Sequence, residues 1–126
     1  MKQIQTSAAP AAIGPYSQAI ISGNFVFTSG GLPLSPESGL VVGNSVTEQT
    51  EQVCKNLKAV LEASGSSLEK AVKATCYLAD MGDFAAFNEV YAKYFTGKPA
   101  RSCVAVKTLP KGVLCEVEAI VCCKEN

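Results

Sequence analysis

Strand-type and helix-type hydrophobic patterns follow one another along this chain, and their order is the feature that most restricts its fold. Residues 17–21 and 24–29 are two β-type runs joined by a glycine turn, which predicts a hairpin. Residues 46–64 then place apolar side chains at helical spacing, and Ser45 with Glu48 three residues later forms a capping-box pattern at the start. The first half of the chain therefore predicts the order ββα.

The second half continues the alternation. Residues 72–78 alternate apolar and polar side chains as a strand does, and a second helical pattern opens at Asp80 or Gly82. Two more strand runs, at about 101–107 and 113–123, flank the turn signal TLPKG. The complete order, ββαβαββ, predicts an α+β sandwich in which two helices cover one face of a mixed sheet. We expect residues 1–126 to form a single domain.

The last strand run has two different faces. One face is uniformly apolar and should meet the helices: Cys115, Val117, Ala119 and Val121. The other face mixes carboxylates with aliphatic side chains: Leu114, Glu116, Glu118 and Ile120. The second face is typical either of a surface that packs against another subunit around a polar site, or of a strand that simply faces solvent.

The absence of histidine excludes several classes of enzyme. The 126 residues contain no histidine, so Ser-His-Asp and Cys-His catalysis, HExxH proteases and histidine-bearing zinc sites are impossible. The net charge is zero, which argues against a dedicated nucleic-acid binder. Hydrophobic residues make up 48% and charged residues only 17% of the chain, so we expect an oligomer that buries the apolar excess.

Six cysteines could suggest a disulfide framework, but their arrangement does not. No CxxC spacing occurs, two of the cysteines are adjacent, and the first residues lack an apolar run typical of a signal peptide. We expect reduced thiols and a soluble, cytoplasmic protein without membrane spans. The cysteines are Cys54, Cys76, Cys103, Cys115, Cys122 and Cys123.

The charged residues that could carry chemistry are few. Arg101 is the only arginine, and its place at the start of an apolar strand suits a clamp for a carboxylate, with a surface or ion-paired arginine as the alternative. Lys107 is a weaker candidate. Glu116 and Glu118 lie on one strand face in an apolar segment, where burial would raise the pKa of a carboxyl group, although a structural salt bridge or an exposed face would give the same pattern.

Other polar positions allow both a functional and a structural interpretation. Tyr16 follows a Gly-Pro turn, and Asn88 lies beside an aromatic stripe at helical spacing that we interpret as core. Ser29 and Gly30, followed by Gly31, end a strand and permit close approach of a ligand or a simple turn. Cys103 shares a strand face with Arg101 and is expected to be an unreactive thiol.

Four segments of the chain resemble the RidA/YjgF family of reactive-intermediate (enamine/imine) deaminases. They are APAAIGPYSQA, TSGGLP, PARSCVAV and LPKGVLCEVEAI, and they occur in the family's order over residues 7–121. The resemblance implies a chorismate-mutase-like α+β fold in a homotrimer with ligand sites between subunits. It also implies cofactor-free and metal-free hydrolysis of 2-imino acids and enamines, such as 2-aminoacrylate, 2-iminopropionate and 2-iminobutyrate, to 2-keto acids and ammonia.

The resemblance also implies roles for particular residues. Arg101 would bind the substrate carboxylate and Glu116 would orient or activate water. The remaining residues would line the pocket: Tyr16, Ser29, Gly30, Asn88 and Cys103. This chain departs from the family at Gly31, where glutamine is common, and in a short turn at 96–98, and both changes bear on the size of the pocket. A trimeric binding module for small carboxylates and a ribonuclease or translation inhibitor are the alternative functions.

The turn between the last two strands gives a geometric expectation. If TLPKG closes a hairpin that pairs Thr108 with Val113, then Ala105 lies opposite Glu116, and Arg101 lies roughly 13 Å along the strand. A direct salt bridge between Arg101 and Glu116 of one chain is then not expected. The site would need a ligand between them or a neighbouring subunit.

Overall fold

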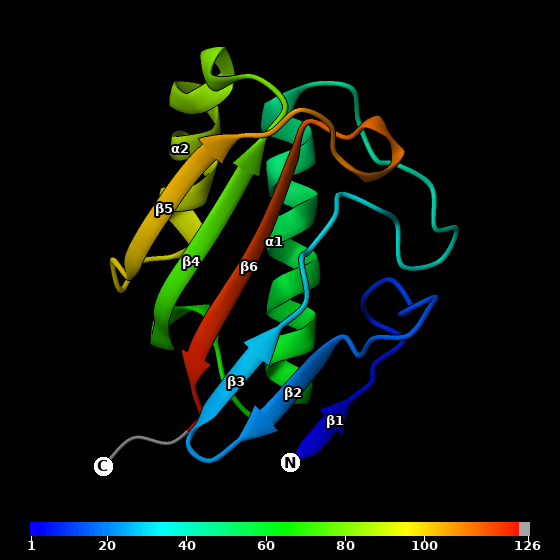
Figure 1. Cartoon of the computed structure of the whole chain (residues 1–126), viewed down its shortest axis with the longest axis vertical. Coiled ribbons are helices and arrows are strands. Elements are labelled where there is room, and N and C mark those ends of the chain that lie inside the picture. The colour runs from blue at the N-terminus through cyan, green and yellow to red at the C-terminus, as the bar shows by residue number, and fades with distance from the viewer. Residues whose placement is uncertain (124–126) are drawn as a thin grey trace.

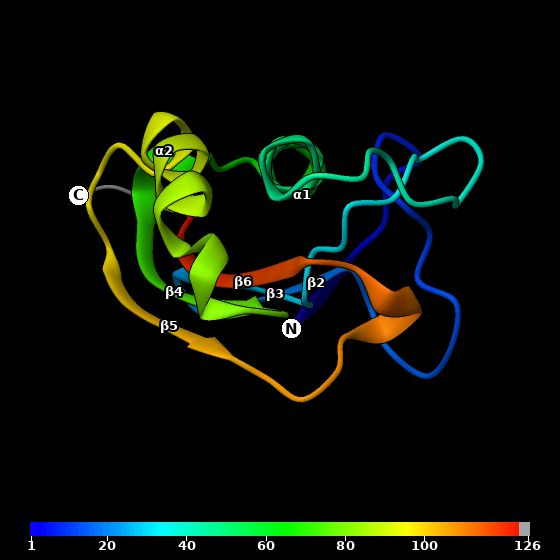
Figure 2. The ribbon, with the colours of Figure 1, turned by 90° about the horizontal axis from the view of Figure 1, so that it is seen from above.

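The computed structural model describes residues 1–123, which fold into two layers, one a six-stranded sheet and the other a pair of helices. Both helices lie on the same face of the sheet (Figures 1 and 2), which confirms the predicted α+β architecture. The strands are β1 (Lys2–Ile4), β2 (Ala19–Ser22), β3 (Phe25–Thr28), β4 (Ala71–Leu78), β5 (Ala100–Ala105) and β6 (Cys115–Cys122). The helices are α1 (Val46–Ala63) and α2 (Phe84–Tyr94), with short 3-10 turns at Leu68–Lys70, Met81–Asp83 and Pro110–Gly112.

The order of the strands in the sheet is β1-β2-β3-β6-β4-β5, so the last strand in sequence lies in the middle. The hairpin between β2 and β3 is antiparallel as predicted, with Ile20 opposite Phe27. The short first strand, which the sequence pattern did not predict, pairs with β2 at the edge. Three residues are too few to show an alternating pattern, so β1 is recognised only by its pairing with β2 in the structure.

The predicted hairpin between the last two strands is wrong. β4 lies between β5 and β6, and it pairs in parallel with β5 and antiparallel with β6. Ala105 is therefore opposite Leu78, and Glu116 is opposite Tyr77. The physical reason is the crossover through α2, which covers the sheet and returns β5 parallel to β4, as strand–helix–strand units do.

Helix α1 begins and ends where the sequence pattern places it. The Ser45 hydroxyl accepts a hydrogen bond from the Glu48 backbone N–H at 3.2 Å, and Gly65 follows the helix with a φ of +78°. Before α2, the Asp80 side chain caps a 3-10 turn by accepting from the Gly82 N–H at 2.7 Å, and the α-helix itself begins at Phe84. Of the two predicted start positions, Asp80 is thus the capping residue.

The two faces of β6 differ as predicted. Its helix-facing side chains are buried against apolar residues of the two helices, such as Leu61 of α1 and Phe87 of α2. Together with Val26 of β3 they form the core. On the opposite face, Phe25 and Phe27 of β3 remain 40% and 42% exposed. In the described part of the chain no helix packs on this second face, and Figure 2 shows both helices on the other side of the sheet. No helix among residues 1–123 is long and apolar enough to cross a membrane.

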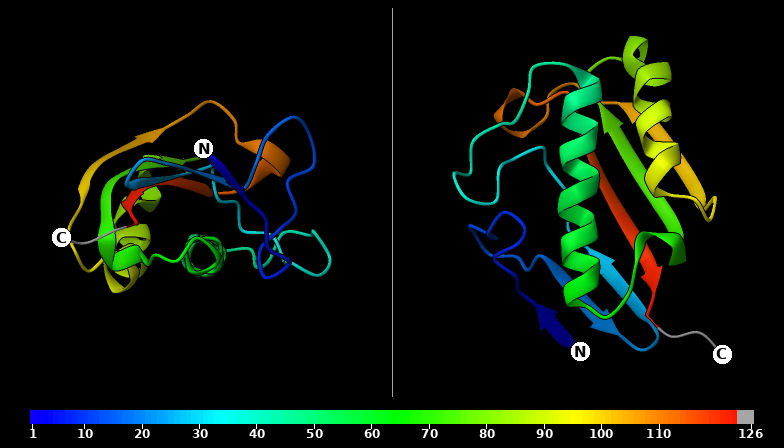
Figure 3. Two further views of the ribbon diagram at one scale, coloured as in Figure 1. Left: turned by 90° about the horizontal axis from the view of Figure 1, so that it is seen from below. Right: turned by 180° about the vertical axis from the view of Figure 1, so that it is seen from behind.

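The long loop after β3 is fixed to α1 by a buried side chain. The Asn56 amide nitrogen donates to the backbone carbonyls of Leu32 and Leu34, each at 2.9 Å. Burial of an amide is favourable only when its hydrogen bonds are made, so these contacts select one path for the loop. Figure 3 shows this loop running beside α1. The loop begins at Ser29 and Gly30, so its anchoring also positions part of the candidate site.

Candidate functional site

The Arg101 side chain lies on the helix-facing side of the sheet and packs against α2. Arg101 is opposite Ala74 of β4, a fully buried residue of the core. Its Nη1 donates a hydrogen bond to Oδ1 of Asn88 at 2.6 Å. The guanidinium carbon lies 4.8 Å from the centre of the Tyr91 ring and 5.4 Å from that of Phe84. Two predicted site residues, Arg101 and Asn88, are therefore brought together.

A pocket of about 390 Å³ opens beside this guanidinium. Within residues 1–123, Arg101 forms no salt bridge, and one of its five N–H donors is used by Asn88. The remaining donors are available to an anion. The pocket is lined by Asn88, Tyr91, Ala92, Phe95, Thr96, Lys98, Pro99 and Arg101.

Cys103 shares the helix-facing side of β5 with Arg101, as predicted, and lies directly opposite Cys76 of β4. Burial raises the pKa of the Cys103 thiol, while Arg101 and a hydrogen bond from Cys76 act in the opposite direction. Burial raises the pKa of Cys76 to about 12. Both side chains are thus neutral thiols at neutral pH, which suits a pocket wall and not a nucleophile.

Glu116 projects from the other face of the sheet. It is half-buried, and its pKa is raised first by burial and then by the neighbouring Glu118. A Cβ atom on Gly30 would overlap the carboxylate oxygen Oε2 of Glu116 and would stand 2.8 Å from its Cδ. Gly30 therefore makes the room in which this carboxylate sits. Lys107, the weaker candidate, is exposed beyond the end of β5.

Tyr16 lies near the same end of the sheet as Gly30. Tyr16, Ser29 and Gly30 line a small pocket of about 80 Å³ at the start of the anchored loop, and the Ser29 hydroxyl donates to the carbonyl of Ser17 at 2.5 Å. The structure thus brings Tyr16, Ser29 and Gly30 together, with Glu116 against Gly30. Tyr16 itself is 54% exposed.

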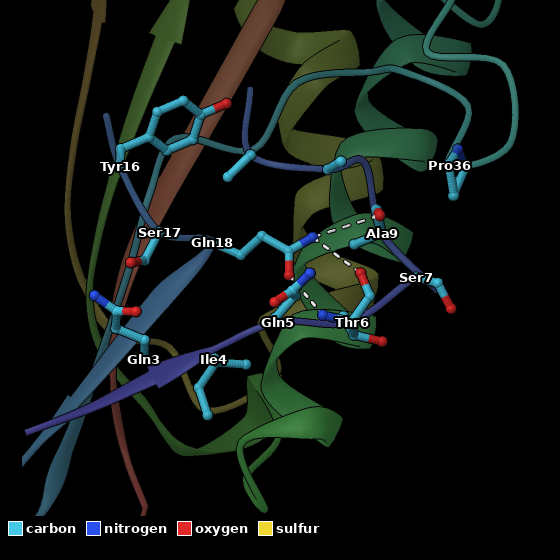
Figure 4. A pocket seen from close by; sticks show the side chains of 12 residues that line it. Gln3, Ile4, Gln5, Thr6, Ser7, Ala9, Tyr16, Ser17, Gln18 and Pro36 are labelled. Atoms are coloured by element: carbon cyan, nitrogen blue, oxygen red, sulfur yellow. Dashed lines mark hydrogen bonds between the residues drawn. The ribbon is translucent and has the colours of Figure 1, made fainter. Parts of the chain in front are cut away.

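A larger pocket of about 480 Å³ adjoins Tyr16 between β1 and residues 6–18 (Figure 4). The Gln18 side chain crosses it, accepting from the Thr6 N–H at 2.8 Å and donating to the Pro10 carbonyl at 2.7 Å. These bonds hold residues 6–10 against Gln18 and satisfy the backbone groups of Thr6 and Pro10. The Gln18 contacts are structural, and the sequence pattern alone did not single this residue out.

Gly31, one of the two departures from the family pattern, faces away from Glu116. A Cβ atom there would lie 3.0 Å from Cγ of Leu57 in α1, and its N–H donates to the Val117 carbonyl at 2.7 Å. The short turn at 96–98 is tight because a Cβ on Gly97 would lie 2.5 Å from the Glu69 carbonyl oxygen. Residue 31 thus affects packing under the loop, while the turn borders the pocket beside Arg101.

The two groups of residues lie on opposite faces of the sheet. Arg101 shares its face with Ala74 and with Ala119, the partner of Ala74 in β6, whereas Glu116 shares the other face with Tyr77. Arg101 and Glu116 accordingly form no salt bridge within one chain, as expected, although the reason is the face and not a distance along a hairpin. One chain therefore carries two separate charged groups, Arg101 under α2 and Glu116 beside Gly30.

Two contacts of Arg101 were not anticipated. Phe84 and Tyr91 belong to the aromatic stripe that the sequence pattern assigned to the core. Phe84 precedes Asn88 by four residues and Tyr91 follows it by three, so all three side chains lie on one side of α2. This spacing is the sequence signal that could have grouped the two aromatic residues with Asn88. Within the described residues, no cluster of three or more His, Cys, Asp or Glu side chains could hold a metal ion.

The sheet, the paired helices and the separate cationic and acidic groups define a small α+β protein with polar sites on two faces. The family model described as Endoribonuclease L-PSP matches residues 6–123. A RutC family protein of Pyrococcus horikoshii is 55% identical over 118 residues, covering 93% of this chain and 94% of that protein. The chain belongs to the Endoribonuclease L-PSP family, which includes the RidA/YjgF proteins that its motifs resemble.

Two further relatives have informative names. Reactive Intermediate Deaminase A, chloroplastic, of Arabidopsis thaliana is 52% identical over 118 residues, covering 93% of this chain and 63% of that protein. The structure of Escherichia coli TdcF with bound serine is 42% identical, with a TM-score of 0.91, and covers 97% of this chain and 98% of that one.

Proposed function

We propose that this protein hydrolyses reactive 2-imino acids and their enamine tautomers to 2-keto acids and ammonia. The observation that carries the proposal is Arg101, a guanidinium held in place without a carboxylate partner within residues 1–123 and open to a pocket. Such a group suits the carboxylate of an amino-acid-derived imine. The deaminase name of the Arabidopsis relative and the serine bound to TdcF support a small substrate of this kind.

In this proposal Arg101 and Glu116 are half-sites, which act together when two protomers meet. Arg101 and Glu116 lie on opposite faces of one sheet, so the cationic group of one protomer and the acidic group of another would form each complete site. The uncovered sheet face, with Phe25, Phe27 and Val104 each at least 40% exposed, supplies apolar surface for such an association. A homotrimer with three sites between subunits is the assembly that we propose.

In the proposed reaction, Arg101 binds the substrate carboxylate and orients the imine carbon. The Glu116 carboxylate accepts a proton from water as the water oxygen bonds to that carbon. The same proton passes to the nitrogen, which gives an amino alcohol at that carbon. Glu116 then takes the proton of the new hydroxyl group and delivers it to the nitrogen as the carbon–nitrogen bond breaks, so that ammonia leaves and the ketone forms. A raised pKa makes Glu116 a better base and a usable acid nearer neutral pH. Tyr16, Ser29, Gly30, Asn88 and Cys103 would shape the pocket, and no cofactor is needed.

The test measures ammonia and 2-oxobutanoate released from 2-iminobutanoate generated in the assay by an amino-acid oxidase. We expect faster release with the wild-type protein than with buffer, and loss of that acceleration in Arg101→Ala and Glu116→Gln. Glu118→Gln is the matched control, because it removes a neighbouring carboxylate from the same strand face. Burial, the larger cause of the raised Glu116 pKa, remains in this variant, so it should keep most of the acceleration. No acceleration by the wild type would overturn the proposal.

The alternatives give different results in the same experiments. A binding module for small carboxylates would bind 2-oxobutanoate through Arg101 without accelerating hydrolysis, and Glu116→Gln would change nothing. The family description names an endoribonuclease. This chain, however, has no histidine, one arginine and zero net charge, a composition that does not favour binding or cleavage of RNA. Cleavage of single-stranded RNA that Arg101→Ala abolishes would favour that function instead.

A further inference from the structure

One side of α2 holds the Arg101 guanidinium by three contacts. Phe84 and Tyr91 present their ring faces, and Asn88, between them on the helix, accepts the hydrogen bond from Nη1. Positions 84, 88 and 91 repeat at the spacing that places side chains on one side of a helix. The guanidinium is thus contacted by two π faces and one amide oxygen.

None of these three contacts carries a negative charge. A carboxylate at position 88 would pair with Arg101 bidentately and would compete with any anionic ligand. An amide oxygen fixes the same nitrogen at 2.6 Å but leaves the positive charge unneutralised. The aromatic faces attract the cation through their quadrupoles and likewise leave its N–H edge unoccupied.

Tyr91, one of the three contacts, is itself packed into the core. Tyr91 is buried and stacks on Phe95 with ring centres 4.4 Å apart and on Phe87 at 5.7 Å. Its hydroxyl is buried without a hydrogen-bond partner among residues 1–123. Tyr91 therefore contacts Arg101 through its ring face and not through its hydroxyl.

We propose that Phe84, Asn88 and Tyr91 are positioning residues that hold Arg101 for an anionic ligand without neutralising its charge. This inference rests on the proposed function, because it assigns a purpose to the same arginine. It assigns Asn88 a task different from lining the pocket: the amide acts on the substrate through Arg101. The ligand class is a small carboxylate, recognised by charge and by the fixed plane of the guanidinium.

The first experiment changes the charge at position 88 and keeps its shape. Asn88→Asp is nearly isosteric and should pair with Arg101, so we expect 2-oxobutanoate to bind at least roughly tenfold more weakly by calorimetry. The same substitution should weaken binding of the uncharged amide of 2-oxobutanoate much less. Ala85→Asp, which adds the same charge at an exposed position of α2, is the matched control and should bind 2-oxobutanoate like the wild type.

The second experiment separates the ring from the hydroxyl at position 91. Tyr91→Leu should weaken 2-oxobutanoate binding by roughly threefold to thirtyfold, the range for loss of a cation–π contact, and Tyr91→Phe should restore it. Tyr94→Leu controls for damage to α2, since Tyr94 is half-buried on the same helix and bonds to Glu51 instead of Arg101. Thermal melting of each variant reports whether it folds.

The outcomes distinguish the two proposals. If Arg101→Ala binds 2-oxobutanoate as well as the wild type, the proposed function fails. If Arg101→Ala loses binding while folded Asn88→Asp and Tyr91→Leu retain it, the positioning role is overturned and the proposed function stands. A loss in Asn88→Asp that is equal for 2-oxobutanoate and its amide would also contradict the role, because a merely structural defect does not distinguish charge.

Discussion

Replacing Gly30 by alanine should separate the proposed catalysis from stability. The new Cβ would overlap Oε2 of Glu116 and would lie 2.8 Å from Cδ and 3.1 Å from Cγ. Because unbonded carbon atoms rest about 3.5–4.0 Å apart, the carboxyl group must move by roughly 1 Å. A displacement of that size at a reacting group costs on the order of 100-fold in rate.

The cost to the fold should be small in the same variant. The atoms that Gly30→Ala approaches are the end of a half-buried, flexible side chain, which can rotate away. We expect the free energy of unfolding in urea to change by less than about 1 kcal/mol, since alanine also lowers the entropy of the unfolded chain. The expected result is thus an intact protein that hydrolyses 2-iminobutanoate about 100-fold more slowly.

Gly31→Ala is the matched control one residue away. Its Cβ would lie 3.0 Å from Cγ and 3.1 Å from Cδ2 of Leu57 and 3.3 Å from the Val117 carbonyl oxygen, so it should destabilise the fold by about 1–3 kcal/mol. It does not approach Glu116, and the folded fraction should keep its activity. Gly30→Ala with a rate within about threefold of the wild type would refute the assignment of Glu116.

Three other measurements follow from particular groups. Tyr91→Phe removes a buried hydroxyl that has no partner among residues 1–123, so we expect about 1 kcal/mol more stability in urea unfolding; a loss of stability would show that the hydroxyl is bonded. The raised pKa of Glu116 means that the folded state holds its proton more tightly than the unfolded state, so this group's contribution to stability falls as pH rises from its ordinary value of 4.5 through the raised one. Glu116→Gln should remove that decline in a pH series of urea unfolding, and a steeper decline in the variant would contradict the sign. Burial raises the pKa of Cys103, so at pH 8 iodoacetamide should alkylate it more slowly than a free thiol, and equal rates would contradict its neutral state.

Local patterns predicted the individual elements well. The Ser45 cap, the apolar period of α1 and the alternation in β6 are set by neighbouring residues, and all three are confirmed, although the Glu48 carboxylate accepts from the Asn44 N–H and not from that of Ser45. The same holds for the β2–β3 hairpin, whose strands are adjacent in sequence. These signals depend on side chains within a few residues of each other, which is the information that a sequence pattern contains.

Strand pairing could not be predicted in the same way. The turn before β6 looked like a hairpin turn, but β4 occupies the position next to β6, and β5 lies at the edge. Which strand becomes a neighbour depends on the crossover of α2 and on burial of the whole sheet face, neither of which the residues around the turn specify. The spacing of Phe84, Asn88 and Tyr91 indicates that they share one side of α2, but only the tertiary structure brings Arg101 to that side.

The sequence alone determined which groups are available: one arginine, no histidine, and a glutamate in an apolar strand, within a ββαβαββ order that requires two layers. The family motifs indicated the same two charged residues. Tertiary structure decided where those groups point. Side chains alternate along a strand, so the register that places Arg101 opposite Ala74 and Glu116 opposite Tyr77 sends them to different faces of the sheet, and that register is set by packing across the whole sheet.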